Sequence, residues 1–129
     1  MTYESGTTNV HTRADEALRD GRGVCQDFAH VLIGVCRSRA IAARYVSGYL
    51  FDPKNDGGES ESHAWVDVFA DDRGWLSLDP THGTEQTDRY VRIGVGRDYA
   101  DVSPTRGVFK GTATESLEVS VRIERLPAT

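Results

Sequence analysis

Long apolar runs are missing from this chain of 129 residues, because no stretch approaches the roughly 18 apolar residues that a membrane-spanning helix requires. The N-terminus also lacks the order of charged and then apolar residues that marks a secretory signal. We therefore expect a cytoplasmic protein without a membrane partner. The length suits one compact domain over residues 1–129.

Basic residues are in the minority: Lys and Arg number 15 and Asp and Glu number 20, which gives a formal charge of −5 at pH 7. Such a charge repels a polyphosphate chain, so we expect no nucleic-acid partner. Common metal motifs are missing too, since the chain has no Cys-x-x-Cys, no His-Glu-x-x-His and no Asp-x-Asp-x-Asp-Gly loop. We expect no metal ion and no cofactor.

Cysteine is scarce as well, with two residues. Cys25 and Cys36 fall in a single helix predicted over residues 25–38. A rise of 1.5 Å per residue separates their Cα atoms by about 16 Å, beyond the limit of roughly 7 Å for a disulfide. Both thiols should be free.

The order of predicted elements indicates an α+β protein. A short helix is expected from about Thr12 to Asp20 with Thr12 as its cap, and residues 55–62 are expected to form an acidic loop. Alternating patterns predict strands, which are mostly antiparallel, over residues 40–51, 63–70, 75–79, 90–95 and 117–124. In these strands Phe69 and Trp75 are expected in the core, and Arg44 in a surface or ion-pair role.

The helix over residues 25–38 carries the strongest pattern in the chain. Its apolar stripe is centred on Cys25 and holds Phe28, Ala29, Leu32, Ile33, Val35 and Cys36, while Gln26, Asp27 and His30 fall on the polar arc. At a helix start, unpaired N–H groups and the helix dipole favour a thiolate over a thiol. Cys25 is therefore a candidate nucleophile, although packing alone also explains it, and Cys36 is expected to be core.

A nucleophilic thiol needs a base, and four histidines compete for that role. His30 points into the polar arc and is expected to be solvated or capping, and His11 lies in a polar segment without periodicity. His82 follows a strand end, where a hydrogen-bonded structural role is expected. His63 opens a strand on the same face as Trp65, a residue fit to cover an imidazole or to line a cleft, so His63 is the candidate base.

Asp79 ends the next strand and is the candidate carboxylate that orients the imidazole. For His63 and Asp79 to share a face, the numbers of paired residues in the hairpin must add up to an even value, such as 142 or 144. A four-residue loop over residues 71–74 gives an odd value. We therefore predict a three-residue or five-residue connection, or a bulge, near Asp71.

Four sequence blocks carry a resemblance to a known family. They are Gly23-Val-Cys25-Gln-Asp-Phe-Ala, Ala43-Arg-Tyr-Val-Ser-Gly-Tyr49, Ser62-His63-Ala-Trp-Val-Asp-Val and Gly74-Trp-Leu-Ser-Leu-Asp79-Pro-Thr. The sequence resembles the transglutaminase-like superfamily over most of its length, including the Gly96-Arg-Asp-Tyr99 and Asp101-Val-Ser-Pro104 segments typical of bacterial members. The resemblance implies a papain-like α+β core, with the cysteine helix packed on an antiparallel sheet.

The family's nucleophile, base and orienting acid correspond to Cys25, His63 and Asp79. Tyr3 resembles the family's aromatic residue upstream of the cysteine and is expected to line the site or the oxyanion pocket, and Trp65 is a second candidate substrate contact. Bacterial members often carry a β-rich region before the cysteine, whereas about two dozen residues precede Cys25 here. We expect either a fragment lacking that region or a minimal member.

A Cys-His-Asp triad carries out acyl transfer on peptide or amide bonds through a thioester. Water as acceptor makes a cysteine protease or amidase, and a lysine amine makes a transglutaminase. The resemblance to small bacterial members favours the hydrolase, acting on a peptide or protein. The alternatives are a protein-glutamine transglutaminase and a catalytically silent peptide-binding module of the same fold. The sequence predicts no oligomeric state.

Overall fold

The structure, a computed structural model, describes residues 1–103 and 120–127 of the chain. Two α-helices come early, α1 (Ala14–Asp20) and α2 (Cys25–Ser38), and strands are the main elements after α2. Two short 3₁₀ helices, η1 (Pro53–Asn55) and η2 (Tyr99–Val102), lie among the strands. The predicted α+β class is confirmed, and α2 has the predicted bounds.

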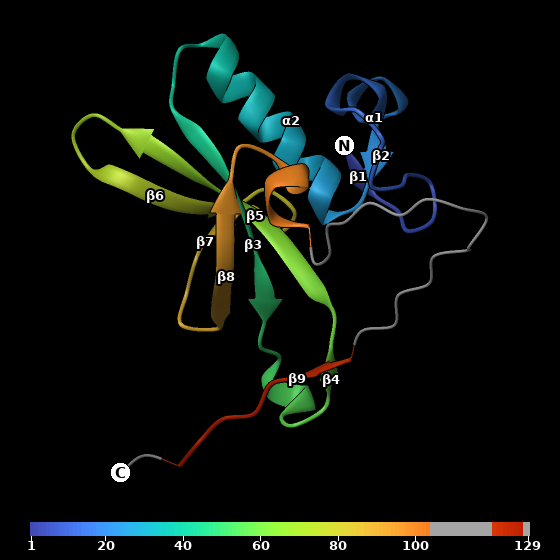
Figure 1. Ribbon diagram of the computed structural model, residues 1–129, viewed down its shortest axis with the longest axis vertical. Coiled ribbons are helices and arrows are strands. Elements are labelled where there is room, and N and C mark those ends of the chain that lie inside the picture. The colour runs from blue at the N-terminus through green and yellow to red at the C-terminus, as the bar shows by residue number, and fades with distance from the viewer. Residues whose placement is uncertain (104–119, 128–129) are drawn as a thin grey trace, which may run out of the picture.

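Five strands form the main sheet in the order β7, β6, β5, β3, β8, and all neighbouring pairs are antiparallel. They are β3 (Ala43–Leu50), β5 (Ser62–Ala70), β6 (Gly74–Asp79), β7 (Thr84–Glu85) and β8 (Tyr90–Gly96). In addition, β1 (Thr2–Tyr3) pairs in parallel with β2 (Arg22–Gly23), and β4 (Glu59–Ser60) pairs antiparallel with β9 (Val121–Arg122). Helix α2 packs across β5 and β3, so the two central layers are a helix and a sheet (Figure 1).

The register of the β5–β6 hairpin is the one predicted. Phe69 pairs with Trp75 and Val66 with Leu78, so that residues 71–73 form a three-residue connection. Each pair adds up to an even number, and His63 and Asp79 therefore share one face of two adjacent strands. This register fixes the relation between the two residues before any side chain is placed.

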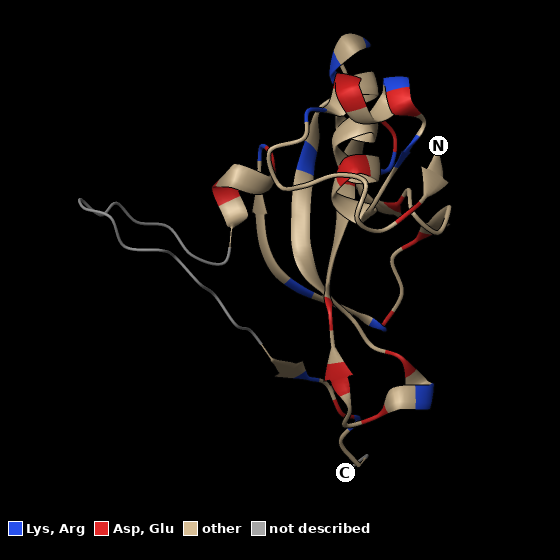
Figure 2. Ribbon diagram, turned by 90° about the vertical axis from the view of Figure 1, so that its right-hand side faces the viewer, with Lys and Arg blue, Asp and Glu red and all other residues tan. Residues whose placement is uncertain are grey.

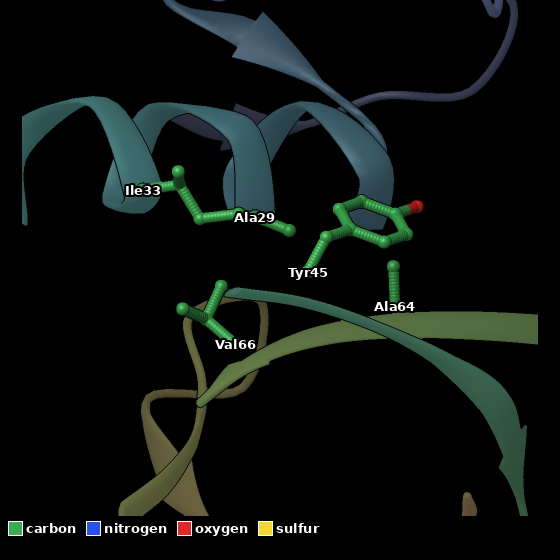
Figure 3. Close-up of a cluster of buried hydrophobic side chains, with 5 residues drawn as sticks. All are labelled: Ala29, Ile33, Tyr45, Ala64 and Val66. Atoms are coloured by element: carbon green, nitrogen blue, oxygen red, sulfur yellow. The ribbon is translucent and has the colours of Figure 1, made fainter. Parts of the chain in front are cut away.

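The core between α2 and the sheet is small and apolar. Figure 3 shows Ala29 and Ile33 on α2 facing Tyr45 of β3 and Ala64 and Val66 of β5. Cys36 is buried as predicted, with 6% of its surface exposed, and both cysteines are free thiols.

Two residues of α2 depart from the predicted wheel. Asp27 was expected on the polar arc but is buried, because its Oδ2 accepts hydrogen bonds from the Val24 N–H at 2.9 Å and the Thr8 hydroxyl at 2.6 Å. Val35 was expected on the packed stripe but is 52% exposed. The N-terminal segment covers the start of α2, which a helical wheel cannot show.

The prediction that Phe69 and Trp75 are core residues was wrong. Their side chains pair across the hairpin at 5.4 Å in an edge-to-face arrangement, but they are 40% and 45% exposed. The hairpin of β5 and β6 reaches outward past α2 (Figure 1), so no second layer formed by the described residues covers its tip. The Arg44 guanidinium lies 4.3 Å from the centre of the Trp75 ring and covers part of it.

Three local expectations also change. Helix α1 begins at Ala14 with Arg13 as its N-cap, and the Thr12 hydroxyl instead accepts a hydrogen bond from the Asn9 N–H. The predicted acidic loop contains β4. Of the predicted last strand, residues 117–119 lie outside the described residues, and the strand β9 includes only Val121 and Arg122.

A buried carboxylate joins four strands of the main sheet. Asp67 of β5 is 1% exposed and accepts hydrogen bonds from Arg44 of β3, Ser77 of β6 and, through both oxygens, Arg92 of β8. The ion pair expected for Arg44 is present. Because every oxygen of Asp67 is engaged, burial of its charge is compensated.

A glycine sets the distance between β3 and β8. The pairing of these strands shifts register between Ser47 and Gly48. A Cβ atom at Gly48 would overlap the Val91 carbonyl and lie 2.7 Å from the Trp65 ring. Glycine here lets β8 approach closely and lets Trp65 pack in full, which matters because Trp65 lies behind His63.

Candidate active site

Cys25 is the first residue of α2, and its position depends on the turn before it. A Cβ atom at Gly23 would lie 2.7 Å from the Asp27 side chain, which holds the start of the helix through the Val24 N–H. Glycine is therefore required where this carboxylate closes over the turn. Cys25 is half-buried and lines a cavity between α2 and the sheet, whereas Cys36 does not line it.

His63 lies near the start of β5, and its ring joins the two other candidate residues. Its Nε2 is 2.8 Å from Asp79 Oδ2, and the ring lines the same cavity as Cys25, close enough for the thiol to raise the pKa of His63. Because Nε2 faces Asp79, Nδ1 is the nitrogen left for the thiol. The side chain is 11% exposed, and the ring stacks on Trp65 at 5.9 Å. The structure thus brings Cys25, His63 and Asp79 together.

Asp79 ends β6 and is a centre of hydrogen bonding. Its Oδ2 accepts from His63, from His82 Nδ1 at 2.8 Å and from the Tyr90 hydroxyl at 2.6 Å. Its Oδ1 accepts from the N–H groups of Thr81 and His82. Asp79 is 1% exposed, and these five contacts fix its carboxylate and compensate the burial of its charge.

The local electrostatics follow from these contacts. Burial opposes protonation of His63, but its hydrogen bond with Asp79 and its interaction with the nearby Cys25 outweigh burial and raise the pKa of His63 to about 9. Burial would raise the pKa of Asp79, but hydrogen bonds from His63, Tyr90 and His82 hold that pKa well below its usual range. An imidazole with a raised pKa is a better proton acceptor for the thiol than a free histidine.

The cavity beside Cys25 has a volume of about 880 Å³, within the range typical of ligand sites. Tyr3 lines it, as expected, while Trp65 does not and is fully buried behind His63. The residues that line the cavity include two acids, Glu59 and Glu61, and no Lys or Arg among those described (Figure 2 colours these residue types on the ribbon). The full described lining is Tyr3, Ser5, Val24, Cys25, Gln26, Tyr45, Ser47, Tyr49, Glu59, Ser60, Glu61, Ser62, His63, Ala64, Ile93, Tyr99, Val102 and Val121.

Trp65 connects the base to the sheet. Its Nε1 donates to Gln86 Oε1 at 3.0 Å, and the same oxygen accepts from Arg92 at 3.1 Å. Arg92 in turn binds Asp67. A chain of polar contacts therefore fixes the indole on which His63 stacks.

The other histidines lie where the site does not need them as a base. His30 is half-buried, not solvated: its Nε2 accepts a hydrogen bond from the Tyr99 N–H at 3.2 Å, and burial lowers its pKa. This contact holds the first N–H of η2, so His30 joins α2 to η2. His82 is hydrogen-bonded to Asp79, as expected, and His11 is exposed in a loop.

One group among the described residues has the donor types of a metal site. His63, Asp79 and His82 each offer a ligand atom, and these atoms lie within 4.8 Å of one another. In both imidazoles, however, the nitrogen that faces Asp79 Oδ2 forms a hydrogen bond with it. A metal ion would have to replace these two hydrogen bonds. The hydrogen bonds account for the cluster without a metal.

Sequence reasoning missed several residues that support the site. Asp27, Tyr90 and Gln86 hold the start of α2, the Asp79 carboxylate and Trp65, respectively. Asp27, three residues after the N-cap, has the spacing of a capping residue, so that signal was available. Tyr90 and Gln86 act across strands that the sequence alone does not pair.

Comparisons with known proteins agree with this geometry. The family model of the transglutaminase-like superfamily matches residues 1–80. An uncharacterised protein of Mycobacterium leprae is 47% identical over 98% of this chain, which covers 46% of that protein. A protein-glutamine gamma-glutamyltransferase of Pseudomonas aeruginosa is 37% identical over 53% of this chain and 11% of its own length.

A solved structure is similar as well. It is the crystal structure of a candidate cysteine protease from Cytophaga hutchinsonii, with a TM-score of 0.69 and 35% sequence identity. The match covers 80% of this chain and 34% of that protein's chain. The chain thus spans less than half the length of the first relatives it matches. In the described residues, neither helix has the length and apolar character needed to cross a bilayer.

Proposed function

Since the chain belongs to the transglutaminase-like superfamily, we propose that it catalyses cysteine-dependent acyl transfer on peptide or amide bonds. Cys25 is the nucleophile, His63 the base and Asp79 the carboxylate that orients the imidazole. The observation that carries the proposal is the His63 ring, which is hydrogen-bonded to Asp79 and lines the same cavity as Cys25, whose proximity raises the pKa of His63. Three chain segments far apart in sequence supply these groups.

The reaction has two halves. The thiol proton passes to His63, the sulfur attacks the amide carbonyl, and collapse of the tetrahedral intermediate breaks the C–N bond while the imidazolium protonates the leaving amine. A thioester remains on Cys25. A second nucleophile then gives its proton to His63, attacks the thioester and releases the acyl group.

Water is the acceptor we propose first, which makes the protein a protease or amidase acting on a peptide or protein. The likeness to a candidate cysteine protease supports this choice. The cavity of about 880 Å³ admits a short stretch of peptide beside Cys25. Tyr3 at the cavity wall is proposed to contact the substrate, and Trp65 to support His63 from behind.

An amine acceptor is the second candidate, which would make the protein a transglutaminase. Two features favour it: Glu59 and Glu61 line the cavity and would attract a cationic amine, and one relative is a protein-glutamine gamma-glutamyltransferase. Cys25, His63 and Asp79 serve both reactions, so the acceptor must be determined by assay.

The test offers the protein both acceptors. A glutamine-containing peptide is incubated with and without a primary diamine, and mass spectrometry follows deamidation, backbone cleavage and amine incorporation. We expect deamidation or cleavage that persists when the diamine is present. Predominant incorporation of the diamine would instead assign the transglutaminase activity.

Three variants control this assay. Cys25→Ala should abolish turnover, and His63→Ala should lower it by roughly 10²- to 10⁴-fold. Cys36→Ala, which removes the thiol outside the cavity, should keep it. Peptide binding by the native protein without any turnover, under the same conditions, would contradict the proposal and assign a silent binding module.

A further inference from the structure

Tyr45 belongs to both the core and the cavity. It lies in the middle of β3, is 2% exposed, and packs between His30 at 5.2 Å and Tyr99 at 6.4 Å between ring centres. It nevertheless lines the cavity together with Cys25. In Figure 3 its oxygen points away from Ile33 and Val66, toward the first turn of α2. The ring is held by the core, and its polar tip faces the site.

The Tyr45 hydroxyl has no hydrogen-bond partner among the described residues. Thr81 Oγ1 is the one fully buried side-chain polar atom of that part of the chain left without a partner. The Tyr45 oxygen is therefore not sealed from solvent, and the space it opens on is the cavity. The hydroxyl of a buried tyrosine normally has a hydrogen-bond partner. A tyrosine hydroxyl without a partner at a cavity wall is therefore suited to bind a polar group of a ligand.

The same hydroxyl retains its proton. Burial raises the pKa of Tyr45, and the charge of Cys25, the first of the charged groups that act on it, raises that pKa further. Tyr45 is thus a hydrogen-bond donor at any pH at which the protein works, and it lies within electrostatic range of Cys25.

The first half of the proposed reaction requires such a donor. When the C–S bond forms, the electron pair of the carbonyl π bond moves onto oxygen and creates an oxyanion. The Cys25 N–H, in the first turn of α2, has no intrahelical partner and can serve as one donor. Gln26 also lines the cavity, but its amide already donates to the Val10 carbonyl at 3.2 Å.

We propose that the Tyr45 hydroxyl is the second donor to the oxyanion of the tetrahedral intermediate at Cys25. This inference rests on the proposed acyl-transfer function. No proton leaves Tyr45: its hydrogen bond forms with the oxyanion and weakens when the electron pair returns to rebuild the carbonyl. The C–N bond breaks in that step, and the proton for the amine comes from His63.

The experiment compares two reactions of the same thiol. Alkylation by iodoacetamide displaces iodide and forms no oxyanion, whereas turnover of an amide substrate passes through one. Tyr45→Phe removes the hydroxyl and keeps the ring between His30 and Tyr99. We expect kcat to fall by roughly 10²- to 10³-fold, KM to change by less than about threefold, and the alkylation rate of Cys25 to stay within about twofold.

Tyr49→Phe is the comparison variant, since it removes another tyrosine hydroxyl of β3 at the cavity wall. Any loss there should appear in KM rather than in kcat. A kcat for Tyr45→Phe within about threefold of the parent protein would overturn the inference. Equal losses in alkylation and turnover would overturn it too, because the hydroxyl would then serve the thiolate.

Failure of this inference can be told from failure of the proposed function. If Cys25→Ala keeps turnover, the function itself is wrong, whereas an inactive Cys25→Ala beside a fully active Tyr45→Phe removes only the role of Tyr45. Should Tyr45→Phe not fold, 3-fluorotyrosine placed at position 45 keeps the shape and makes the phenol more acidic. An altered kcat with unaltered alkylation then supports the inference, and an unaltered kcat overturns it.

Discussion

Cys25 and Cys36 lie near opposite ends of α2, and of the two only Cys25 lines the cavity. Cys36 is 6% exposed, and burial raises the pKa of its thiol. We predict that iodoacetamide alkylates Cys25 more than about tenfold faster than Cys36 in the native protein. Mass spectrometry of timed samples measures both rates. The difference should vanish in denaturant, and equal rates in the native state would contradict the assignment.

Asp79 accepts five hydrogen bonds, so its replacement affects more than the base. We predict that Asp79→Ala lowers turnover and also lowers the free energy of unfolding by about 1–3 kcal/mol, because buried donors lose their acceptor. Asp79→Asn should cost less, since its amide oxygen can still accept from His63. Kinetics and urea unfolding of both variants provide the test, and an unchanged pH profile in Asp79→Ala would leave Cys25 and His63 as a dyad.

The strands of the main sheet depend on the contacts of Asp67. Arg92 of β8 gives Asp67 two hydrogen bonds, at 2.6 and 2.8 Å, and also contacts Ser77 and Gln86. We predict that Arg92→Met destabilises the protein by about 2–3 kcal/mol in urea unfolding, because it leaves a buried carboxylate with fewer partners.

The matched control for this element is Arg22→Met. Arg22 pairs with Glu4 at 3.5 Å, and both side chains are about half exposed. An ion pair of this kind contributes little, so the free energy of unfolding should change by less than about 0.5 kcal/mol. Similar losses in the two variants would show that β8 does not depend on Asp67.

The stability of the whole molecule should depend on pH through His63. Its pKa is about 9 in the folded protein, and a free histidine has a value of 6.5. The folded state therefore holds a proton that the unfolded state has lost between these values. The resulting stabilisation is fully present below about pH 6.5 and is lost as the pH rises through about 9.

We expect the free energy of unfolding to fall by up to about 3 kcal/mol over this window. Urea titrations at pH 6, 7.5 and 9 measure it. His63→Gln should show a shallower slope over the same window, and an identical slope would mean that the pH dependence comes from other groups.

Local pattern was enough to predict several parts of this protein. The helical period of residues 25–38 gave the bounds of α2, and the requirement that His63 and Asp79 share a strand face predicted the even register of the hairpin. Both are properties of neighbouring residues, since a repeat of 3.6 or 2 and a turn length follow from the chain itself. Cys25 as a helix-start thiol and Cys36 as core follow from the same pattern.

Which faces of the helices and strands other segments cover is determined only in the folded molecule. Asp27 is buried because the N-terminal segment crosses it, and Trp75 is exposed because the hairpin extends past α2. The contacts of Asp79 with His63 and Tyr90 likewise arise between separate strands, and the Tyr45 hydroxyl has no hydrogen-bond partner among the described residues. A periodic pattern states which side chains share a face, but burial and hydrogen bonding depend on what other segments bring to that face, and this is fixed only when the elements pack.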